Sequence, residues 1–157
     1  MITTGIGYDC HRFAAERRLV LGGVEVEHDR GLEGHSDADV LTHAVIDALL
    51  GAAGLGDIGQ HFPDTDPRYA GSDSIELLES VAATLGQHGF TVVNVDATVI
   101  VEQPAIAPHR EKMRSRLAGA LAIAVERVNV KATRGEGMGF VGRGEGAACL
   151  AVATVER

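Results

Sequence analysis

The feature of this chain that most constrains its fold is a change in the spacing of its apolar residues. Between residues 40 and 49 these residues recur three and four apart, which is the spacing of an amphipathic helix. Residues 90–101 instead alternate with a period of two, which is the spacing of a strand. We therefore expect an α/β or α+β domain in which a mainly β layer is backed by helices.

Along the whole chain, the apolar spacing predicts the following order of elements: strands, helix, helix, strand, helix, strand, strand. The first helix is expected to be capped by Ser36 or Asp37 and to end at Gly51 or Gly54. Residues 28–34 and 54–71 are expected to be loops, and the second loop is long enough to suggest a function or mobility. The other expected helices cover residues 73–88 and 108–124, and the expected strands cover residues 2–13, 19–21, 24–26, 90–101, 128–132 and 147–155.

Composition narrows the class of protein further. The 157 residues are expected to form one domain, 1–157, whose core is built from Val, Leu, Ile and Ala, because aromatic residues make up only 4% of the chain. A net charge of −8 without a Lys/Arg tract argues against nucleic acid as a partner. No apolar run approaches the length of a membrane span and no signal peptide is recognisable, so we expect a cytoplasmic protein without membrane contact. The two cysteines form no disulfide framework, and Cys10 is expected on a buried face.

One carboxylate and two imidazoles suggest a metal site. Asp9 and His11 stand two apart on an expected strand, so both side chains leave by the same face, while His43 lies on the first helix. Such a ligand set leaves zinc an open coordination position, which is typical of a site that binds substrate. Two simpler interpretations remain open. The Asp9 and His11 pair is also common at surface turns, and His43 has Asp39 and Asp47 one turn away as partners for a surface ion pair.

Two further segments could bind phosphate or a polyol. His35 and Ser36 precede a helix, whose N-terminus favours anions, although Ser36 could equally serve only as its cap. Asp57, Asp64 and Asp66 place three carboxylates in the long loop, where they could bind hydroxyl groups or a hard cation, or could simply be solvated turn residues.

A glycine-rich segment follows the strand at 128–132. Glycine lets a backbone approach a ligand closely, while Thr133 and Arg134 can donate to phosphate and Glu136 can bind a cation. Taken alone, this segment is a weak signal of function.

These motifs, in this order, resemble one family, the 2-C-methyl-D-erythritol 2,4-cyclodiphosphate synthases of the non-mevalonate isoprenoid pathway. The resemblance covers essentially the whole chain. The matching stretches are Gly5–Phe13, Gly34–His43, Leu49–Gly59, His61–Pro67, Asn129–Thr133 and Gly139–Gly146.

The resemblance implies a homotrimer with active sites shared between subunits. It implies a lyase reaction in which the 2-phosphate of 4-diphosphocytidyl-2-C-methyl-D-erythritol 2-phosphate attacks the β-phosphorus and expels CMP. Zinc would be held by Asp9, His11 and His43. A second divalent cation, Mg²⁺ or Mn²⁺, would bridge the substrate phosphates and be held by Glu136.

The resemblance also implies the residues that touch the substrate, with catalytic roles for His35, Thr133 and Arg134. The implied substrate-binding residues are Asp9, His11, His35, Ser36, Asp57, Ile58, Gly59, Phe62, Pro63, Asp64, Thr65, Asp66, Val101, Glu102, Gln103, Pro104, Ala105, Ile106, Ala107, Ala132, Thr133, Arg134, Gly135, Glu136, Phe140 and Arg143.

The chain departs from the family pattern at two positions. Arg134 stands where the family has a second threonine, and we expect it to act as a stronger phosphate donor. Ala105 stands where many members have a lysine near the cytosine. Two rival functions are a metal-dependent nucleotide phosphodiesterase and a non-catalytic trimer that binds an isoprenoid diphosphate in an axial cavity, through positions such as Arg143 and Glu145.

Overall fold

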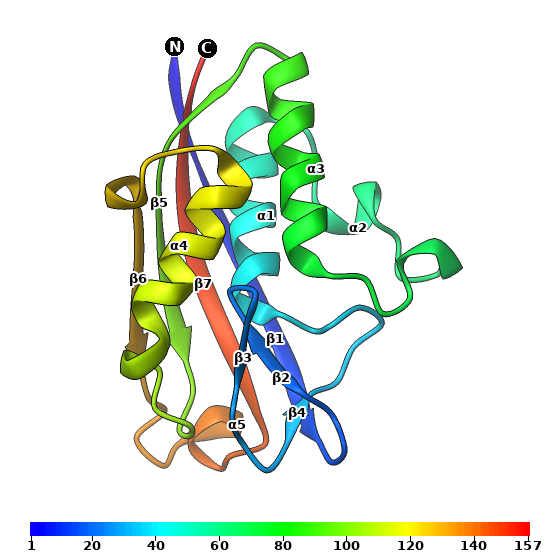
Figure 1. The fold of residues 1–157 in the computed structure, drawn as a ribbon, viewed down its shortest axis with the longest axis vertical. Coiled ribbons are helices and arrows are strands. Elements are labelled where there is room, and N and C mark those ends of the chain that lie inside the picture. Colours follow the sequence, from blue (N-terminus) through cyan, green and yellow to red (C-terminus); the bar gives the residue numbers. More distant parts are fainter.

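The molecule consists of a main sheet, a layer of helices that covers one of its faces, and a separate hairpin (Figure 1). The computed structural model describes all 157 residues. The main sheet has the strand order β4-β1-β7-β5-β6, in which β5 and β6 are parallel and the other neighbours antiparallel. A separate hairpin pairs β2 with β3. The strands are β1 (Ile2–Ala14), β2 (Leu19–Leu21), β3 (Val24–Val26), β4 (Gly31–Leu32), β5 (Thr91–Ile100), β6 (Val128–Thr133) and β7 (Gly146–Glu156).

Three long helices lie on one face of this sheet (Figure 1). They are α1 (Val40–Ala53), α3 (Ser74–Gln87) and α4 (Arg110–Leu121). Short helical turns occupy the connections: α2 (Ile58–His61), α5 (Gly139–Gly142), and the 3-10 turns η1 (Pro67–Tyr69), η2 (Ala107–His109) and η3 (Val125–Arg127). None of the helices has the length and apolar character needed to cross a membrane. The expected architecture, a β layer backed by helices, is confirmed.

Helix α1 is central to the fold. Eleven of its 14 residues are buried, so it is enclosed by its neighbours on almost every side and not only along the predicted stripe. It packs unusually closely on β1, because a Cβ atom added to Gly5 or Gly7 would lie 2.2 Å from the Ala48 carbonyl oxygen or 1.9 Å from that of Ala44. Only glycine permits this approach, which brings the strand carrying Asp9 against the helix.

The opposite face of the sheet carries no helix. Ile6 and Val152 are paired in register on this face, as are Tyr8 and Leu150, and all four side chains are exposed. Cys10 also lies here and is exposed. The expectation of a buried Cys10 is therefore wrong, because strand alternation turned it away from Asp9 toward the uncovered face.

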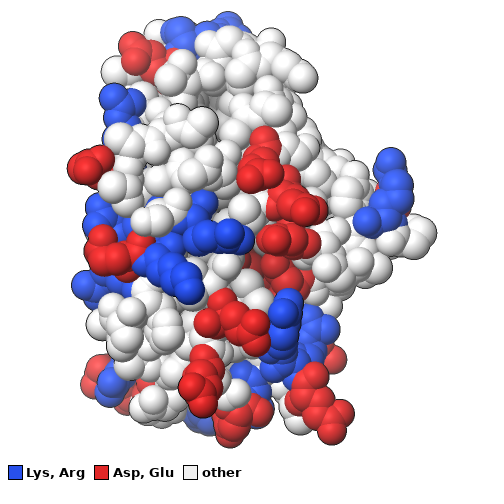
Figure 2. All heavy atoms as spheres, viewed as in Figure 1, with Lys and Arg blue, Asp and Glu red and all other residues white.

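Charged side chains are segregated on the helical face (Figure 2). Lys and Arg gather over α4, and Asp and Glu gather over α3. The negative net charge of the chain therefore does not exclude a local positive field near α4.

Several predicted boundaries differ from the structure. The cap of α1 is Asp39, not Ser36 or Asp37, and its carboxylate accepts hydrogen bonds from the backbone of Thr42, Gly22 and Gly23 at 2.7–3.0 Å. This carboxyl group is completely buried, and burial raises its pKa although the backbone donors oppose the shift. The carboxylate of Asp39 thus satisfies the backbone N–H of Thr42 in the first turn of α1.

Three other differences have local causes. A β-bulge between Val92 and Asn94 interrupts the period of two expected for residues 90–101, so the buried residues Val92 and Val95 stand three apart. Helix α4 ends at Leu121, earlier than predicted, because Ala122 adopts a left-handed conformation with φ of 54°. The predicted loop at 28–34 contains the short strand β4, which pairs with the end of β1.

Candidate metal centre and substrate pockets

Three predicted ligands meet where β1 faces α1. Asp9 Oδ2 lies 2.9 Å from His11 Nε2 and 3.0 Å from His43 Nδ1. The three potential ligand atoms all lie within 4.8 Å of one another. His43 is 9% exposed, so the alternative of a surface histidine paired with Asp39 or Asp47 is wrong. Asp47 instead accepts a hydrogen bond from the backbone of Ile58.

Each histidine ring has its other nitrogen engaged away from this cluster. His11 Nδ1 lies 2.8 Å from the carbonyl oxygen of Glu33, which can only accept, so this nitrogen carries the proton. His43 Nε2 lies 2.7 Å from Ser74 Oγ and 3.2 Å from Ser36 Oγ. In a neutral imidazole whose remote nitrogen donates, the nitrogen that faces Asp9 carries a lone pair, which is the form in which histidine binds a metal.

Contacts among Asp9, His11 and His43 shift the pKa values of Asp9 and His11. Burial alone would raise the pKa of Asp9, but the hydrogen bonds and charges of His11 and His43 outweigh it and lower the pKa to about 2. Burial alone would lower the pKa of His11, yet the hydrogen bond and negative charge of Asp9 raise it. A carboxylate is thus held ionised beside two imidazoles.

This donor set fits a zinc ion. One carboxylate and two imidazoles supply three ligands and leave a position for a water or a substrate oxygen. His11 Nε2 is buried and faces the Asp9 carboxylate at 2.9 Å, an arrangement that a metal ion held by both groups would satisfy. The hydrogen bonds of the remote ring nitrogens are the kind of support that orients histidine ligands in metal sites.

A cavity of about 400 Å³ opens beside the three ligands. Eight of the residues predicted to bind substrate line it: Asp9, His11, His35, Ser36, Ile58, Gly59, Phe62 and Asp64. Four others of the same stretches do not: Asp57, Pro63, Thr65 and Asp66. Asp57 caps α2 through Gln60, and Asp66 binds Arg68 while its carbonyl oxygen lies 3.1 Å from His35 Nε2.

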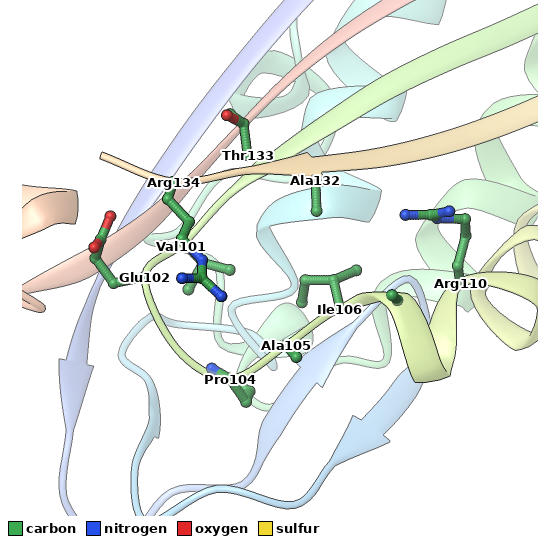
Figure 3. A pocket seen from close by; sticks show the side chains of 10 residues that line it. Val101, Glu102, Pro104, Ala105, Ile106, Arg110, Ala132, Thr133 and Arg134 are labelled. Carbon is green, nitrogen blue, oxygen red and sulfur yellow. The ribbon is translucent and has the colours of Figure 1, made fainter. Parts of the chain in front are cut away.

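A second pocket, of about 220 Å³, lies at the ends of β5 and β6 (Figure 3). Its predicted lining residues are Val101, Glu102, Pro104, Ala105, Ile106, Ala107, Ala132, Thr133 and Arg134, while Gln103 and Gly135 lie outside it. Figure 3 shows Ala132 and Arg134 on the pocket side of β6 and the Thr133 side chain on the opposite side. The side-chain hydroxyl of Thr133 therefore does not point into this pocket.

The two pockets share no residue, and three further predicted residues also line neither of them. Glu136 is exposed and has a left-handed backbone, Phe140 is exposed, and Arg143 forms an exposed ion pair with Glu145 at 3.0 Å. Within one chain Glu136 is therefore not brought to the Asp9 cluster.

Several residues of these sites were missed from the sequence. Tyr69 and Leu77 line the first pocket, and Arg110 lines the second. Arg110 Nε is buried and has no hydrogen-bond partner, which makes it an available donor. Ser74 contacts His43 and is itself bound by Asp37. In the sequence, Ser74 and Asp37 are marked only by their position near the expected start of a helix. Residues that merely cap a helix occupy the same positions, so this signal does not distinguish the two roles.

Comparison with known proteins supports a common family. The model of the YgbB family matches residues 2–156. The bifunctional enzyme IspD/IspF of Anaeromyxobacter dehalogenans (strain 2CP-C) is 62% identical over 156 residues, which cover 99% of this chain and 40% of that protein. The chain therefore spans well under half the length of this relative.

Other relatives match over nearly their full length. The 2-C-methyl-D-erythritol 2,4-cyclodiphosphate synthase of Alkaliphilus oremlandii (strain OhILAs) is 54% identical, with 96% of each chain covered. The structure of Plasmodium falciparum IspF in complex with CDP superposes with a TM-score of 0.86 at 29% identity, covering 98% of this chain and 95% of that one. This chain belongs to the YgbB family, the family of the 2-C-methyl-D-erythritol 2,4-cyclodiphosphate synthases.

Proposed function

We propose that this protein catalyses the metal-dependent cyclisation of 4-diphosphocytidyl-2-C-methyl-D-erythritol 2-phosphate, with release of CMP. The observation that carries the proposal is the convergence of Asp9, His11 and His43 beside a cavity lined by His35 and Ser36. The full-length relatives named as synthases of this cyclic diphosphate support the same reaction.

The residues of the chain have the chemistry that such a reaction needs. The attacking phosphate belongs to the substrate, so the protein must fold a flexible chain into a reactive geometry, and no protein nucleophile is required. His35 and Ser36 would hold the methylerythritol phosphate end, and the second pocket would hold the cytidine. Zinc held by Asp9, His11 and His43, and Mg²⁺ or Mn²⁺ held with Glu136, would supply charge neutralisation at the phosphates.

Arg134 would take over the phosphate contact that the family assigns to its second threonine. Its guanidinium lines the second pocket, and an Arg–phosphate pair is a strong, charge-assisted contact. The Thr133 side chain lies on the other side of β6 from this pocket, so it would contact the substrate from that side.

We also propose that three copies assemble, with each active site shared between neighbours. The uncovered sheet face supports this, because Ile6, Tyr8, Leu150 and Val152 form a contiguous exposed apolar patch. The separation of the two pockets within one chain supports it as well, since a site of substrate size would need one pocket from each of two subunits.

Phosphorus NMR of the purified protein with zinc, magnesium and the substrate tests the reaction. We expect CMP and a cyclic diphosphate to form in equal amounts. His43→Ala should abolish turnover, whereas His88→Ala, which removes an exposed histidine at the end of α3, should not change it. A linear diphosphate would show a hydrolase instead. Zinc and CMP binding without turnover would leave a non-catalytic binding protein.

A further inference from the structure

A buried serine connects the proposed metal ligand His43 to a carboxylate on another segment. Ser74 begins α3 and is completely buried. Its Oγ lies 2.7 Å from His43 Nε2 and also contacts Asp37 Oδ1. The backbone N–H of Ser74 donates to the other oxygen of Asp37 at 2.9 Å. The three groups form a continuous chain behind the metal centre, on the side away from Asp9.

The direction of each hydrogen bond follows from the chemistry of the groups. An ionised carboxylate only accepts, so the single hydroxyl proton of Ser74 must be donated to Asp37. Ser74 Oγ can then only accept from the ring of His43. His43 Nε2 must therefore carry a proton. In the neutral form of the ring this leaves the lone pair on Nδ1, the atom that lies 3.0 Å from Asp9 Oδ2.

Asp9 exerts the opposite preference. In the absence of a metal, its carboxylate would be best satisfied by a proton on His43 Nδ1, which would block that nitrogen as a ligand. Two carboxylates thus compete for one ring proton from opposite sides. The Asp37–Ser74 pair draws the proton to Nε2 and leaves Nδ1 available to a metal.

We propose that Asp37 and Ser74 are positioning residues that set the tautomer and orientation of His43 for metal binding. This inference rests on the proposed metal site. Supports of this kind typically change metal affinity by about 10- to 100-fold. Ser36 is a weaker candidate for the same role, because its Oγ lies farther from Nε2, at 3.2 Å, and also accepts from the backbone of Ala38.

The test combines histidine tautomers with zinc affinity. In ¹⁵N-histidine-labelled, zinc-free protein at about pH 8, long-range ¹H–¹⁵N NMR should show the His43 proton on Nε2. In Ser74→Ala it should move toward Nδ1, and zinc affinity from chelator competition should fall about 10- to 100-fold. Ser80→Ala, which removes an exposed serine of the same helix, should change neither result. Ser36→Ala should weaken zinc binding by less than Ser74→Ala does.

The outcomes separate this inference from the proposed function. If His43 of the wild-type protein carries its proton on Nδ1, the inference fails whether or not any variant folds. A Ser74→Ala protein that loses thermal stability but keeps its tautomer and zinc affinity would also overturn it, because Asp37 and Ser74 would then only anchor α3. If wild-type protein binds no zinc, the metal site fails, while the zinc-free tautomer measurement still decides the proposed role of Ser74.

Discussion

At the scale of single residues, the site combines ionisable groups with donors that have no partner within the chain. In the Asp9 cluster, His11 Nε2 is buried against the Asp9 carboxylate, and in the second pocket Arg110 Nε is buried without a hydrogen-bond partner. Unsatisfied buried polar atoms are uncommon in folded proteins because each costs about 1–3 kcal/mol. Two of the three such atoms, His11 Nε2 and Arg110 Nε, belong to residues that line the pockets, where a ligand could complete them, and the third is Thr3 Oγ1.

Arg110 should therefore contribute to nucleotide binding. It lies in the first turn of α4 and lines the pocket that also contains Ala105, where many relatives are expected to have a lysine. We expect Arg110→Ala to weaken CDP binding about tenfold, which corresponds to about 1.4 kcal/mol for one charge-assisted contact. Isothermal titration calorimetry measures this. Arg116→Ala, an exposed arginine of the same helix, is the control, and equal affinities of the two variants would contradict a specific role for Arg110.

At the scale of elements, the metal centre depends on how closely β1 approaches α1. Gly5, Gly7, Asp9 and His11 share one face of β1, and the two glycines let the helix backbone lie directly on the strand. The same contact that packs the core therefore sets the distance between Asp9 and His43. A substitution that changes the packing of β1 on α1 therefore also changes the distance between the proposed metal ligands.

Gly7→Ala tests this coupling. The added Cβ would lie 1.9 Å from the Ala44 carbonyl oxygen, so the strand and helix must separate. We expect the free energy of unfolding to fall by about 1–3 kcal/mol, as for other overpacked cores, together with a loss of zinc affinity. Chemical denaturation and chelator competition measure the two effects. Gly119→Ala in α4, where an added Cβ meets nothing within 4 Å, should lower neither. Unchanged zinc affinity in a destabilised Gly7→Ala protein would contradict the coupling.

The elements were largely predictable because their apolar residues carry a clear period. The predicted element boundaries are wrong where a backbone irregularity interrupts the period and no characteristic residue type marks it. The bulge after Val92 inserts one residue without a glycine, and Ala122 ends α4 in a conformation that usually signals glycine. Likewise Ser36, Asp37 and Asp39 are all good caps by type, and only the nearby β2–β3 turn selects Asp39.

The site was predictable only in its metal-binding part. Asp9, His11 and His43 could be found because residue type and spacing both indicate ligands. Ser74 and Arg110 could not, since their roles arise from contacts between segments 31 residues apart, as in Ser74 with His43, or from a pocket between elements. Such contacts are set by tertiary packing and leave no local pattern.

At the scale of the whole molecule, the two faces of the sheet differ in what covers them. One is covered by helices and forms the core, while the other exposes apolar side chains to solvent in a single chain. A face of this kind favours association, because burying it releases water from apolar surface. The oligomeric state should therefore respond to charge on β7.

Leu150→Glu should prevent assembly. In a trimer closed by this face, three copies would each bury an unpaired carboxylate, which is strongly unfavourable. Light scattering coupled to gel filtration should show the mass fall to about one third of the wild-type value. Ala83→Glu, on the exposed surface of α3, should leave the mass unchanged. A wild-type protein with the mass of one chain would refute the proposed trimer, and an assembled Leu150→Glu protein would place the interface elsewhere.

The pairing of the first and last strands has a consequence for the order of the chain. Ile2 is paired with Glu156, and the backbone N–H of Arg157 donates to the carbonyl oxygen of Met1 at 3.0 Å. Figure 1 shows both ends together, at the end of the sheet opposite α5. A short linker could therefore join residue 157 to residue 1 and new ends could be opened in a surface loop, giving a circular permutant with the same sheet. The same three-dimensional site could therefore be built by a chain whose segments follow one another in a different order.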